Sequence, residues 1–254
     1  MDSIIYEIED QSEASHWWHV CRRDLFRRVI MGFNLKSDIR TLDVGTSTGT
    51  NLRLLSNMGF KSVTGVDYSR EAIKYCARKG LGNVKYGDMQ NLPFSDGAFD
   101  LVLATDIIEH IEDDSQAMRE LVRVLSPGGK ALITVPTFMS LWGSNDDLSH
   151  HKRRYNKLEI SALAHTAGLR IEKQFYFNFF LFVPIWVVRR IFHYMPSPQP
   201  SELKMNPPII NLILKWIFSL DVTLAPILHP PFGVSYLLAC EKPVSLENCD
   251  EERL

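Results

Sequence analysis

Short β-branched runs alternate with helical stretches between Arg40 and Val135, and this alternation constrains the fold more than any other feature of the sequence. Five runs predict strands: TLDV, SVTGVD, NVKYGD, FDLVLAT and KALITVP. Three stretches between them predict helices: Asn51 to Met58, Arg70 to Lys79 and Asp113 to Val124. Such alternation is typical of a parallel sheet with helices on both faces. We therefore expect an α/β fold.

The rhythm breaks after Pro136, and the rest of the chain is more irregular. Pro127-Gly128-Gly129 predicts a turn that leads into the strand from Lys130. Lys157 to Ala167 predicts a helix with Gly168 as its C-cap, and Gly233 to Cys240 predicts a last strand. We expect an N-terminal leader (1–35), one main domain (36–240) with an apolar helical insertion (179–230), and a solvated tail (241–254).

Composition excludes several classes of protein. The chain has 254 residues, 45% of them apolar, which excludes a disordered or disulfide-stapled chain. The formal net charge of −2 gives no reason to expect nucleic acid as a partner. The four cysteines have no CxxC or Cys/His spacing, so we expect no metal site and reduced thiols. The acidic start lacks a secretory signal, and we expect a cytoplasmic protein.

A glycine-containing loop, D-V-G-T-S-T-G-T-N, follows the first predicted strand and precedes a helix. Its Gly45, Ser47 and Gly49 differ from the GxGxxG of nicotinamide-binding folds, and Asp43 would be unfavourable beside a pyrophosphate. The carboxylate of Asp43 suits a cofactor with a cationic amine or sulfonium, while amides at the helix start still favour a carboxylate.

Two further acids end neighbouring strands. Asp67 ends the second strand, where it can accept hydrogen bonds from both ribose hydroxyls of an adenosine. Asp88 ends the third and can accept from an adenine amino group, with Met89 along the ring. Acids at strand ends are about as often helix caps or turn formers when taken singly. Three acids in register favour a nucleoside site.

LDVGTSTGTN, VTGVDYS, YGDM, FDLVLATDIIEHI and LSPGGKALITVP together resemble the class I S-adenosylmethionine-dependent methyltransferases of small molecules. The resemblance implies a Rossmann-like, doubly wound seven-stranded sheet with one antiparallel strand. It also implies S-adenosyl-L-methionine as cofactor and S-adenosyl-L-homocysteine as product. The implied cofactor residues are Asp43, Gly45, Thr46 and Gly49 at the methionine end, Asp67 with Tyr68 at the ribose, and Asp88 with Met89 at the adenine. Ser47 departs from the family, which usually has glycine there.

Methyl transfer from a sulfonium needs an aligned acceptor and no water, and a base helps when the acceptor is a hydroxyl or protonated amine. The fourth strand ends in T-D-I-I-E-H, which places Asp106 and His110 at the carboxyl edge of the sheet. By resemblance Asp106 lies close to the donor, and both residues are candidate catalytic groups. The alternative is that His110 only packs beneath the sheet.

The segment H-H-K-R-R-Y follows the fifth strand and resembles the H-x-R-R-Y stretch of bacterial methyltransferases of unassigned substrate. It predicts His151 as the main acceptor-side catalytic residue, with Arg154 and Tyr155 binding the acceptor. The alternative is a solvated charge run that pairs with Asp146 and Asp147.

Aromatic and basic residues recur in the leader. His16 and Trp17 are expected to form part of a lid and an acceptor wall, although Trp17 and Trp18 could equally pack on the domain. Arginines recur near helical spacing, for which a solvated face is the default and an anionic headgroup site the alternative: Arg22, Arg23, Arg27 and Arg28.

Two apolar stretches follow the basic segment. Phe175 to Val188 is too short to span a membrane, and its first half predicts a strand. Ile209 to Leu228 carries a polar stripe every four residues, which predicts an amphipathic helix: Asn211, Lys215 and Ser219. This helix is expected to cover the acceptor pocket, form a dimer surface, or lie in a membrane surface.

These observations predict methyl transfer from S-adenosylmethionine to an oxygen or nitrogen of a small amphiphilic or anionic acceptor, such as a lipid, glycan or secondary metabolite. A nucleotide-dependent oxidoreductase and a non-catalytic, membrane-associated scaffold are the alternatives. The expected partner is a small-molecule acceptor, with no nucleic acid, and peripheral membrane contact through residues 175–228 is left open. Either a monomer or a homodimer is compatible with the sequence.

Overall fold

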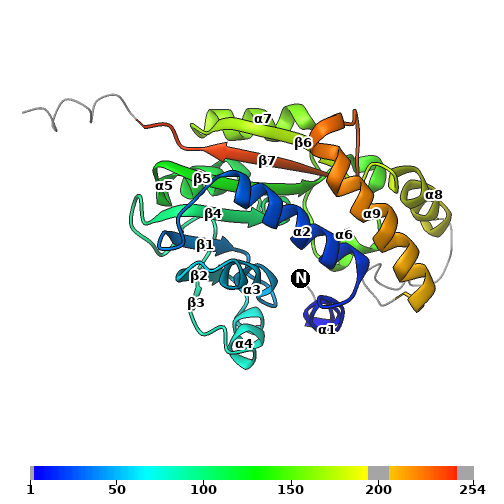
Figure 1. Ribbon diagram of the computed structural model, residues 1–254, viewed down its shortest axis with the longest axis horizontal. Helices are drawn as coiled ribbons and strands as arrows, with labels where there is room; N and C mark the ends of the chain where they lie inside the picture. Colours follow the sequence, from blue (N-terminus) through cyan, green and yellow to red (C-terminus); the bar gives the residue numbers. More distant parts are fainter. Residues whose placement is uncertain (1–2, 194–205, 245–254) are drawn as a thin grey trace, which may run out of the picture.

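A computed structural model describes residues 3–193 and 206–244 (Figure 1). The strands are β1 (Arg40–Val44), β2 (Ser62–Asp67), β3 (Val84–Tyr86), β4 (Phe99–Thr105), β5 (Leu125–Pro136), β6 (Arg170–Phe177) and β7 (Ser235–Glu241). The longer helices are α1 (Ser3–Ser12), α2 (Trp17–Gly32), α3 (Thr50–Asn57), α4 (Arg70–Arg78), α5 (Asp114–Val124), α7 (Lys157–Thr166), α8 (Phe182–His193) and α9 (Pro208–Leu228). Shorter turns are η1 (Ile108–His110), η2 (Met139–Leu141) and α6 (Ser144–Leu148).

All seven strands belong to one sheet in the order β3-β2-β1-β4-β5-β7-β6. Neighbouring strands from β3 to β5 are parallel, and β7 is antiparallel to both β5 and β6. Successive strands are added on one side of β1 up to β3 and on the other side from β4 onward. The carboxyl ends of β1, β2 and β4 therefore meet at a switch point of the sheet, where open α/β sheets bind ligands. The predicted Rossmann-like sheet with one antiparallel strand is confirmed.

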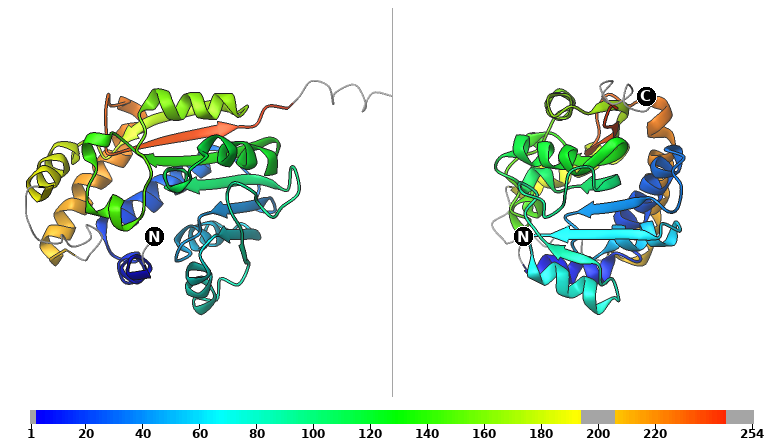
Figure 2. Two further views of the ribbon diagram at one scale, coloured as in Figure 1. Left: turned by 180° about the vertical axis from the view of Figure 1, so that it is seen from behind. Right: turned by 90° about the vertical axis from the view of Figure 1, so that its left-hand side faces the viewer.

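Alternating side chains of the central strand divide the core into two layers. Leu101 and Leu103 pack with α2, α3 and α9, whereas Val102 and Ala104 pack with α5 and α7. This period of two follows from the pleat of a strand that is buried on both faces. Figure 2 shows α2 and α9 on one side of the sheet and α5 and α7 on the other.

Local signals explain why the helices begin and end where they do. The Ser69 hydroxyl accepts from the Ala72 amide at the start of α4, and Asp113 accepts from the Gln116 amide at the start of α5. Asn156 and Glu159 form a capping box on α7, which Gly168 follows at φ +97°. The three helices predicted before Val135 are present to within a residue or two.

The strand β5 differs from the prediction. It begins at Leu125 and runs through Pro127-Gly128-Gly129, which was expected to be a turn. Its register on β4 shifts between Phe99 and Leu101, so the three residues form an irregularity within the strand. Gly128 has φ +76°, and its amide donates to the Lys242 carbonyl at 2.7 Å. Pairing with the chain beyond β7 therefore keeps the segment extended.

The two apolar stretches form β6, α8 and α9. The strand β6 accounts for the start of the first stretch as predicted, and α8 for its end. Asp221 of α9 is buried, and its carboxylate accepts from the amides of Asn178, Phe179 and Phe180 at 2.6–2.9 Å. This carboxylate ties the β6–α8 connection to α9. The segment 194–205, with Lys204, and the predicted tail from 245 lie outside the described residues.

The helix α9 packs polar side chains against the protein and exposes several apolar side chains to the outside. Its polar stripe contacts α2: the Asn211 side chain accepts from the Trp17 amide at 2.9 Å, and the Ser219 hydroxyl lies 3.2 Å from the Cys21 thiol. Phe218, Val222 and Ala225 of α9 are buried, whereas other apolar residues are exposed, Trp216 by 70% and Leu212 by 66%. By length and composition α9 could also cross a membrane, which is weak evidence taken alone.

Candidate active site

A cavity of about 1100 Å³ opens at the carboxyl edge of the sheet. Its walls are the glycine loop after β1, the ends of β2, β3 and β4, the helices α1 and α2, the segment 145–154 and one side of α8. The cavity therefore lies over the switch point of the sheet.

The glycine loop is shaped by close approach of its neighbours. A Cβ at Gly45 would lie 2.7 Å from Cδ1 of Ile107, and this residue has φ +74°, so only glycine fits. Ser47 also adopts a positive φ, +48°, although it is not glycine. Its hydroxyl donates to the carboxylate of Glu9 on α1. The departure from the family pattern thus connects the loop to the N-terminal helix.

Asp67 occupies the predicted place at the end of β2 and lines the cavity. Its two oxygens accept from the amides of Ser69 and Ser47, at 2.7 and 2.9 Å. Burial raises the pKa of this carboxyl, and the two amide hydrogen bonds oppose that rise. Carboxylate oxygens have further lone pairs, which suits an acceptor of ribose hydroxyls.

Asp43 lies behind the cavity wall and is fully buried. Asn51, which lines the cavity, donates to Oδ1 of Asp43 at 3.0 Å, while Oδ2 has no hydrogen-bond partner among the described residues. Burial raises the pKa of Asp43 to about 7. Direct contact between Asp43 and a cofactor stays a prediction, because Asn51 stands between Asp43 and the cavity. Gly49 is also outside the lining and begins α3 at φ +87°.

The residues predicted to contact the adenine all line the cavity. Asp88, Met89 and Tyr68 line the cavity after β3 and β2. Met89 is buried, whereas Tyr68 is 67% exposed and packs at a tilt against Tyr86. Oδ1 of Asp88 accepts from the Gln90 amide at 2.9 Å, so the carboxylate also acts as a turn former.

The helix α1 and the turn after it cover the glycine loop. Oε2 of Glu13 accepts from the hydroxyls of Thr48 and Thr50, at 2.7 and 2.9 Å. The Lys79 ammonium lies 3.0 Å from the same oxygen. The leader therefore lies over the predicted cofactor end, as expected for a lid.

These features fit S-adenosylmethionine. Gly45 leaves room for close approach, and Asp67 offers a carboxylate to a ribose. Three acids line the cavity, Glu9, Asp67 and Asp106, and Asp43 lies behind its wall, which favours a cationic amine and sulfonium. A dinucleotide pyrophosphate would face these acids instead. The observed donors and acceptors thus match the predicted cofactor and oppose the oxidoreductase alternative.

Asp106 follows β4 with φ +53° and lines the cavity. Its Oδ1 accepts from the Thr134 hydroxyl at 2.9 Å, and its Oδ2 pairs with the Arg22 guanidinium. Arg22 also lies over the Trp18 and Phe26 rings, at 5.5 and 5.2 Å. The default expectation of a solvated arginine face is therefore wrong for Arg22, because α2 turns this residue into the cavity.

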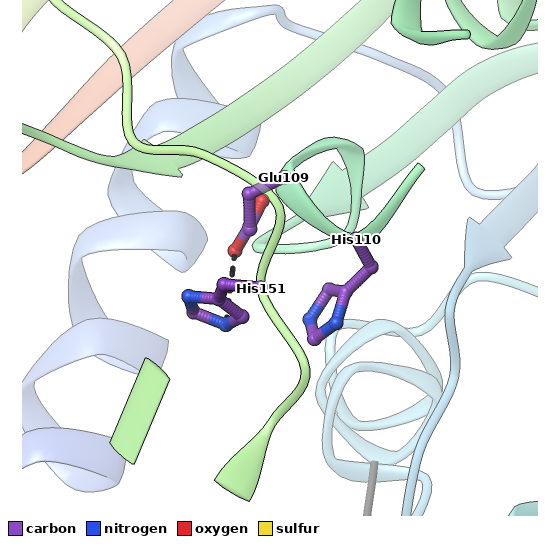
Figure 3. Close-up of side chains that lie close together, drawn as sticks. All are labelled: Glu109, His110 and His151. Carbon is purple, nitrogen blue, oxygen red and sulfur yellow. Dashed lines mark ion pairs between the residues drawn. The ribbon is translucent and has the colours of Figure 1, made fainter. Parts of the chain in front are cut away.

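Three side chains gather at the other end of the cavity: Glu109 and His110 from η1, and His151 from the loop before α7 (Figure 3). The His110 and His151 rings meet edge to face, with centroids 4.5 Å apart. Nε2 of His151 lies 3.9 Å from Oε1 of Glu109. Burial lowers the pKa of His110 to about 3, and burial followed by the charge of Asp106 raises the pKa of Glu109 well above its usual value. His110 is thus a neutral ring at the cavity.

Asp146 organises the H-H-K-R-R-Y segment. Its Oδ1 lies 2.8 Å from Nδ1 of His151, and both of its oxygens accept from the Arg154 guanidinium, at 2.8 and 2.9 Å. Burial alone would raise the pKa of Asp146, but His151 and Arg154 outweigh it and hold the pKa below its usual range. The alternative of a solvated charge run is right about the pairing of Arg154 with Asp146 and wrong about the solvation, since these three residues are buried or nearly so.

Arg154 and Tyr155 differ from their predicted places. Arg154 lines the cavity, but its guanidinium donates two hydrogen bonds to the carboxylate of Asp146. Arg154 therefore positions Asp146 instead of offering both N–H groups to an acceptor. Tyr155 lies outside this cavity because its buried phenol donates to Asp114 at 2.8 Å. An acceptor contact from Tyr155 does not fit this placement.

His16 and Trp17 both line the cavity as predicted. Nδ1 of His16 accepts from the Trp18 amide at 3.4 Å, so His16 caps α2 and burial lowers its pKa to about 4. Trp17 packs edge to face on Phe218 of α9, with centroids 5.3 Å apart. His16 and Trp17 therefore line the cavity and also hold α2 in place, His16 as its N-cap and Trp17 by packing on α9.

Several lining residues escaped sequence reasoning. Glu9, Arg22 and Asn51 each lie on a helix whose position over the cavity depends on tertiary packing. The spacing of Arg22 within a basic run gave the opposite indication. Of the three, only Asn51 could have been predicted from the sequence. It is a polar residue at the end of the glycine loop, a position that faces the ends of the strands.

Comparison with known proteins agrees with this geometry. Residues 42–133 match the family model described as a methyltransferase domain. The chain is 30% identical over 134 residues to a probable S-adenosylmethionine-dependent methyltransferase of Mycolicibacterium smegmatis, covering 52% of each chain. It is 39% identical over 136 residues to phthiotriol/phenolphthiotriol dimycocerosates methyltransferase 1 of Mycobacterium ulcerans, covering 52% of this chain and 47% of the relative.

A solved S-adenosylmethionine-dependent methyltransferase from Thermotoga maritima shares the fold, with a TM-score of 0.58 and 20% identity over 95% of this chain and all of that one. The matches to the two curated relatives span about half of their length. The matched segment holds the glycine loop, Asp67, Asp106 and the Glu109–His110 pair. Over residues 42–133 the chain is therefore similar to a methyltransferase domain, and its relatives include S-adenosylmethionine-dependent methyltransferases.

Proposed function

We propose that the protein transfers a methyl group from S-adenosylmethionine to an oxygen or nitrogen of a small amphiphilic acceptor. The observation that carries this proposal is one cavity whose lining includes the glycine loop, Asp67 and the Glu109–His110–His151 cluster. The cofactor supplies an activated methyl group on a sulfonium. The chain binds and orients both reactants and excludes water.

Asp106, His110 and His151 are the proposed acceptor-side residues. Asp146 at Nδ1 fixes the tautomer of His151, so that Nε2 is the nitrogen that faces the cavity. His151 assists loss of the acceptor proton, and the neutral His110 ring adjoins it. Asp106 is held by Arg22 and Thr134, which keeps its carboxylate in the lining of the cavity.

Cofactor binding tests the proposal directly. Asp67→Ala should weaken S-adenosylmethionine and S-adenosylhomocysteine by roughly five- to a hundredfold, because buried ribose hydroxyls lose their partner. Calorimetric titration of wild type and variant measures this change. Asp96→Ala is a control, since Asp96 is an exposed acid whose side chain pairs with Arg123 outside the cavity. Unchanged affinity in Asp67→Ala, or tighter binding of NAD by the wild type, would contradict the proposal.

An amphiphilic acceptor fits the far wall of the cavity. This wall is apolar, and its residues lie in the chain before and after the segment 194–205: Leu181, Ile185, Val188 and Leu214. The same two helices, α8 and α9, carry exposed apolar residues on their outer sides: Val183, Trp186, Val187, Ile191, Ile209, Leu212, Ile213 and Trp216. The apolar wall and the exposed surface therefore belong to the same pair of elements. The relative from Mycobacterium ulcerans is named for phthiotriol and phenolphthiotriol dimycocerosates.

We further propose that the exposed α8–α9 surface lies on an anionic lipid surface. The charges that these helices expose are basic, Arg190 and Lys215, whereas their single acid, Asp221, is buried. The Arg190 guanidinium lies 5.6 Å above the Trp186 ring, an arrangement suited to a membrane interface. Exposed aliphatic groups flanked by cations favour lipid over water and anionic lipid over neutral lipid.

Vesicle binding tests this attachment. Ile213→Asp with Trp216→Asp should lower binding to phosphatidylserine-containing vesicles by at least about tenfold, because each exposed apolar side chain contributes roughly 1.5–3 kcal/mol on burial. Leu158→Asp is the matched control, since Leu158 is 77% exposed on α7. Equal binding by both variants, or a wild-type dimer that the double substitution dissociates, would contradict the lipid assignment.

A further inference from the structure

Within the described part of the chain, the carboxyl group of Glu109 lacks the hydrogen-bond partners that a buried polar group requires. The residue is fully buried, and neither oxygen has a hydrogen-bond partner among the described residues. Buried carboxylates are ordinarily hydrogen-bonded, paired or bound to a metal ion, because leaving them unsatisfied is costly. Figure 3 shows this carboxylate beside the rings of His110 and His151. One potential ligand atom from each residue lies within 4.8 Å of the others.

Both histidine rings also have polar contacts outside the cluster. Nδ1 of His151 lies 2.8 Å from the Asp146 carboxylate, which Arg154 fixes in turn. The His110 ring has a hydrogen bond to the backbone of Ser149. Histidines that bind a metal characteristically donate their second N–H to a carboxylate or a backbone carbonyl, which orients the ring. The supporting contacts of such a site are therefore present around the cluster.

The backbone brings the two segments together. The Lys152 amide donates to the Glu109 carbonyl at 2.8 Å, so the residue after His151 is joined to η1. Two ligand atoms of one ion, each about 2.0–2.2 Å from it, lie roughly 3–3.5 Å apart. The 3.9 Å between Nε2 of His151 and Oε1 of Glu109 would need to shorten by only a few tenths of an ångström to reach that range.

We propose that Glu109, His110 and His151 bind one divalent first-row transition cation. Two imidazoles and one carboxylate suit zinc, cobalt, iron or manganese better than magnesium or calcium. The sequence alone predicts no metal here, since these residues follow none of the usual ligand spacings and meet only in the fold.

This inference rests on the proposed function and narrows its acceptor. Three protein ligands leave coordination positions on the cavity side, which two neighbouring oxygens of one molecule can occupy, as in a vicinal diol or a hydroxy-carbonyl compound. A bound cation would lower the pKa of a coordinated hydroxyl, so that the acceptor would release its proton to bulk water on binding, before methyl transfer. His151 acts in this arrangement as a ligand, and the cation takes over its part in removing the acceptor proton.

Direct titration of the full chain with Co²⁺ and Mn²⁺, after dialysis against a chelator, tests the site. We expect one equivalent to bind, with visible absorption bands of Co²⁺ ligated by nitrogen and oxygen. Glu109→Gln and His151→Ala should weaken binding more than about 100-fold, and Asp146→Asn by about 10- to 100-fold. His165→Ala is the control, because His165 is exposed on α7. Absence of binding by the wild type, or wild-type affinity in Glu109→Gln, would overturn the site.

Cofactor titration of the same proteins separates this inference from the proposed function. Glu109→Gln keeps the shape of the side chain, so S-adenosylmethionine should bind to it as to the wild type. Methyl transfer that persists at full rate in excess chelator would overturn the cation site and leave the proposed function standing. Failure of the metal-loaded wild type to bind S-adenosylmethionine would overturn the proposed function, whereas the Co²⁺ spectrum would still report the site.

Discussion

At the scale of single residues, the site depends on how burial sets the charge of its acids. Asp43 is fully buried and has one hydrogen bond, from Asn51. Its pKa is raised to about 7, so at neutral pH the carboxyl is only partly ionised. A cation in the adjoining cavity favours the ionised form. The charge of Asp43 is therefore coupled to what the cavity holds.

This coupling predicts a pH dependence of cofactor binding. Because the cationic cofactor lowers the pKa of Asp43, binding releases a proton, and affinity should rise with pH up to about 7 and level off above it. Calorimetry between pH 5.5 and 8, in buffers of different ionisation enthalpy, measures the proton release. Asp43→Asn removes the titrating group and should flatten this part of the profile. An identical slope in Asp43→Asn would contradict the assignment.

Gly45 allows a second prediction at this scale, because the chain contains a matched control. Gly45→Ala places a methyl group 2.7 Å from Ile107 at φ +74°, whereas Gly59→Ala at φ +90° meets nothing within 4 Å. Both substitutions strain the backbone by about 1 kcal/mol, and Gly45→Ala adds an overpacking cost of about 1–3 kcal/mol. Urea denaturation and cofactor titration should show a larger loss for Gly45→Ala on both measures.

At the scale of elements, the order of strands and helices was predictable and their orientation was not. Short, nearly continuous apolar runs such as FDLVLAT identify strands, because both faces of β4 are buried. The four-residue polar spacing in α9 correctly predicts a helix with a polar stripe. It does not say which side faces the protein. The stripe turns inward because Asn211 and Ser219 find partners on α2, and these partners are more than 190 residues away in sequence.

The helix α1 gives a prediction about such long-range partners. Glu13→Ala removes the acceptor shared by Thr48, Thr50 and Lys79, so α1 should detach from the glycine loop more often. Hydrogen exchange of the α1 amides should accelerate about tenfold or more, and cofactor affinity should fall. Glu7→Ala is the control, since Glu7 is exposed on the same helix. Equal exchange in both variants would show that α1 is held by other contacts, such as the Tyr6–Tyr75 stack.

At the scale of the whole molecule, the meeting of the predicted cofactor residues at one edge of the sheet could be foreseen, because they lie in one continuous segment. Gly45, Asp67 and Asp88 follow successive strands, so sequence order alone brings them to one edge of the sheet. The acceptor end combines η1 with the segment 145–154 and with α2 and α8, whose meeting depends on packing. His151 was correctly predicted to lie at the cavity. The guanidinium of Arg154 was predicted to bind the acceptor but binds Asp146 instead, a contact that depends on packing.

Because the cavity joins elements from both ends of the chain, ligand binding should stabilise the whole molecule. S-adenosylhomocysteine at a hundred times its dissociation constant contributes about 2.7 kcal/mol, which for a domain of this size raises the melting temperature by about 5–10 °C. Thermal denaturation followed by circular dichroism measures the shift. Asp67→Ala at the same ligand concentration should lose most of it, and Leu158→Asp should keep it, because Leu158 lies far from the cavity lining. A shift confined to fluorescence of Trp17 and Trp18, without a change in the global transition, would show instead that the ligand orders only the lid.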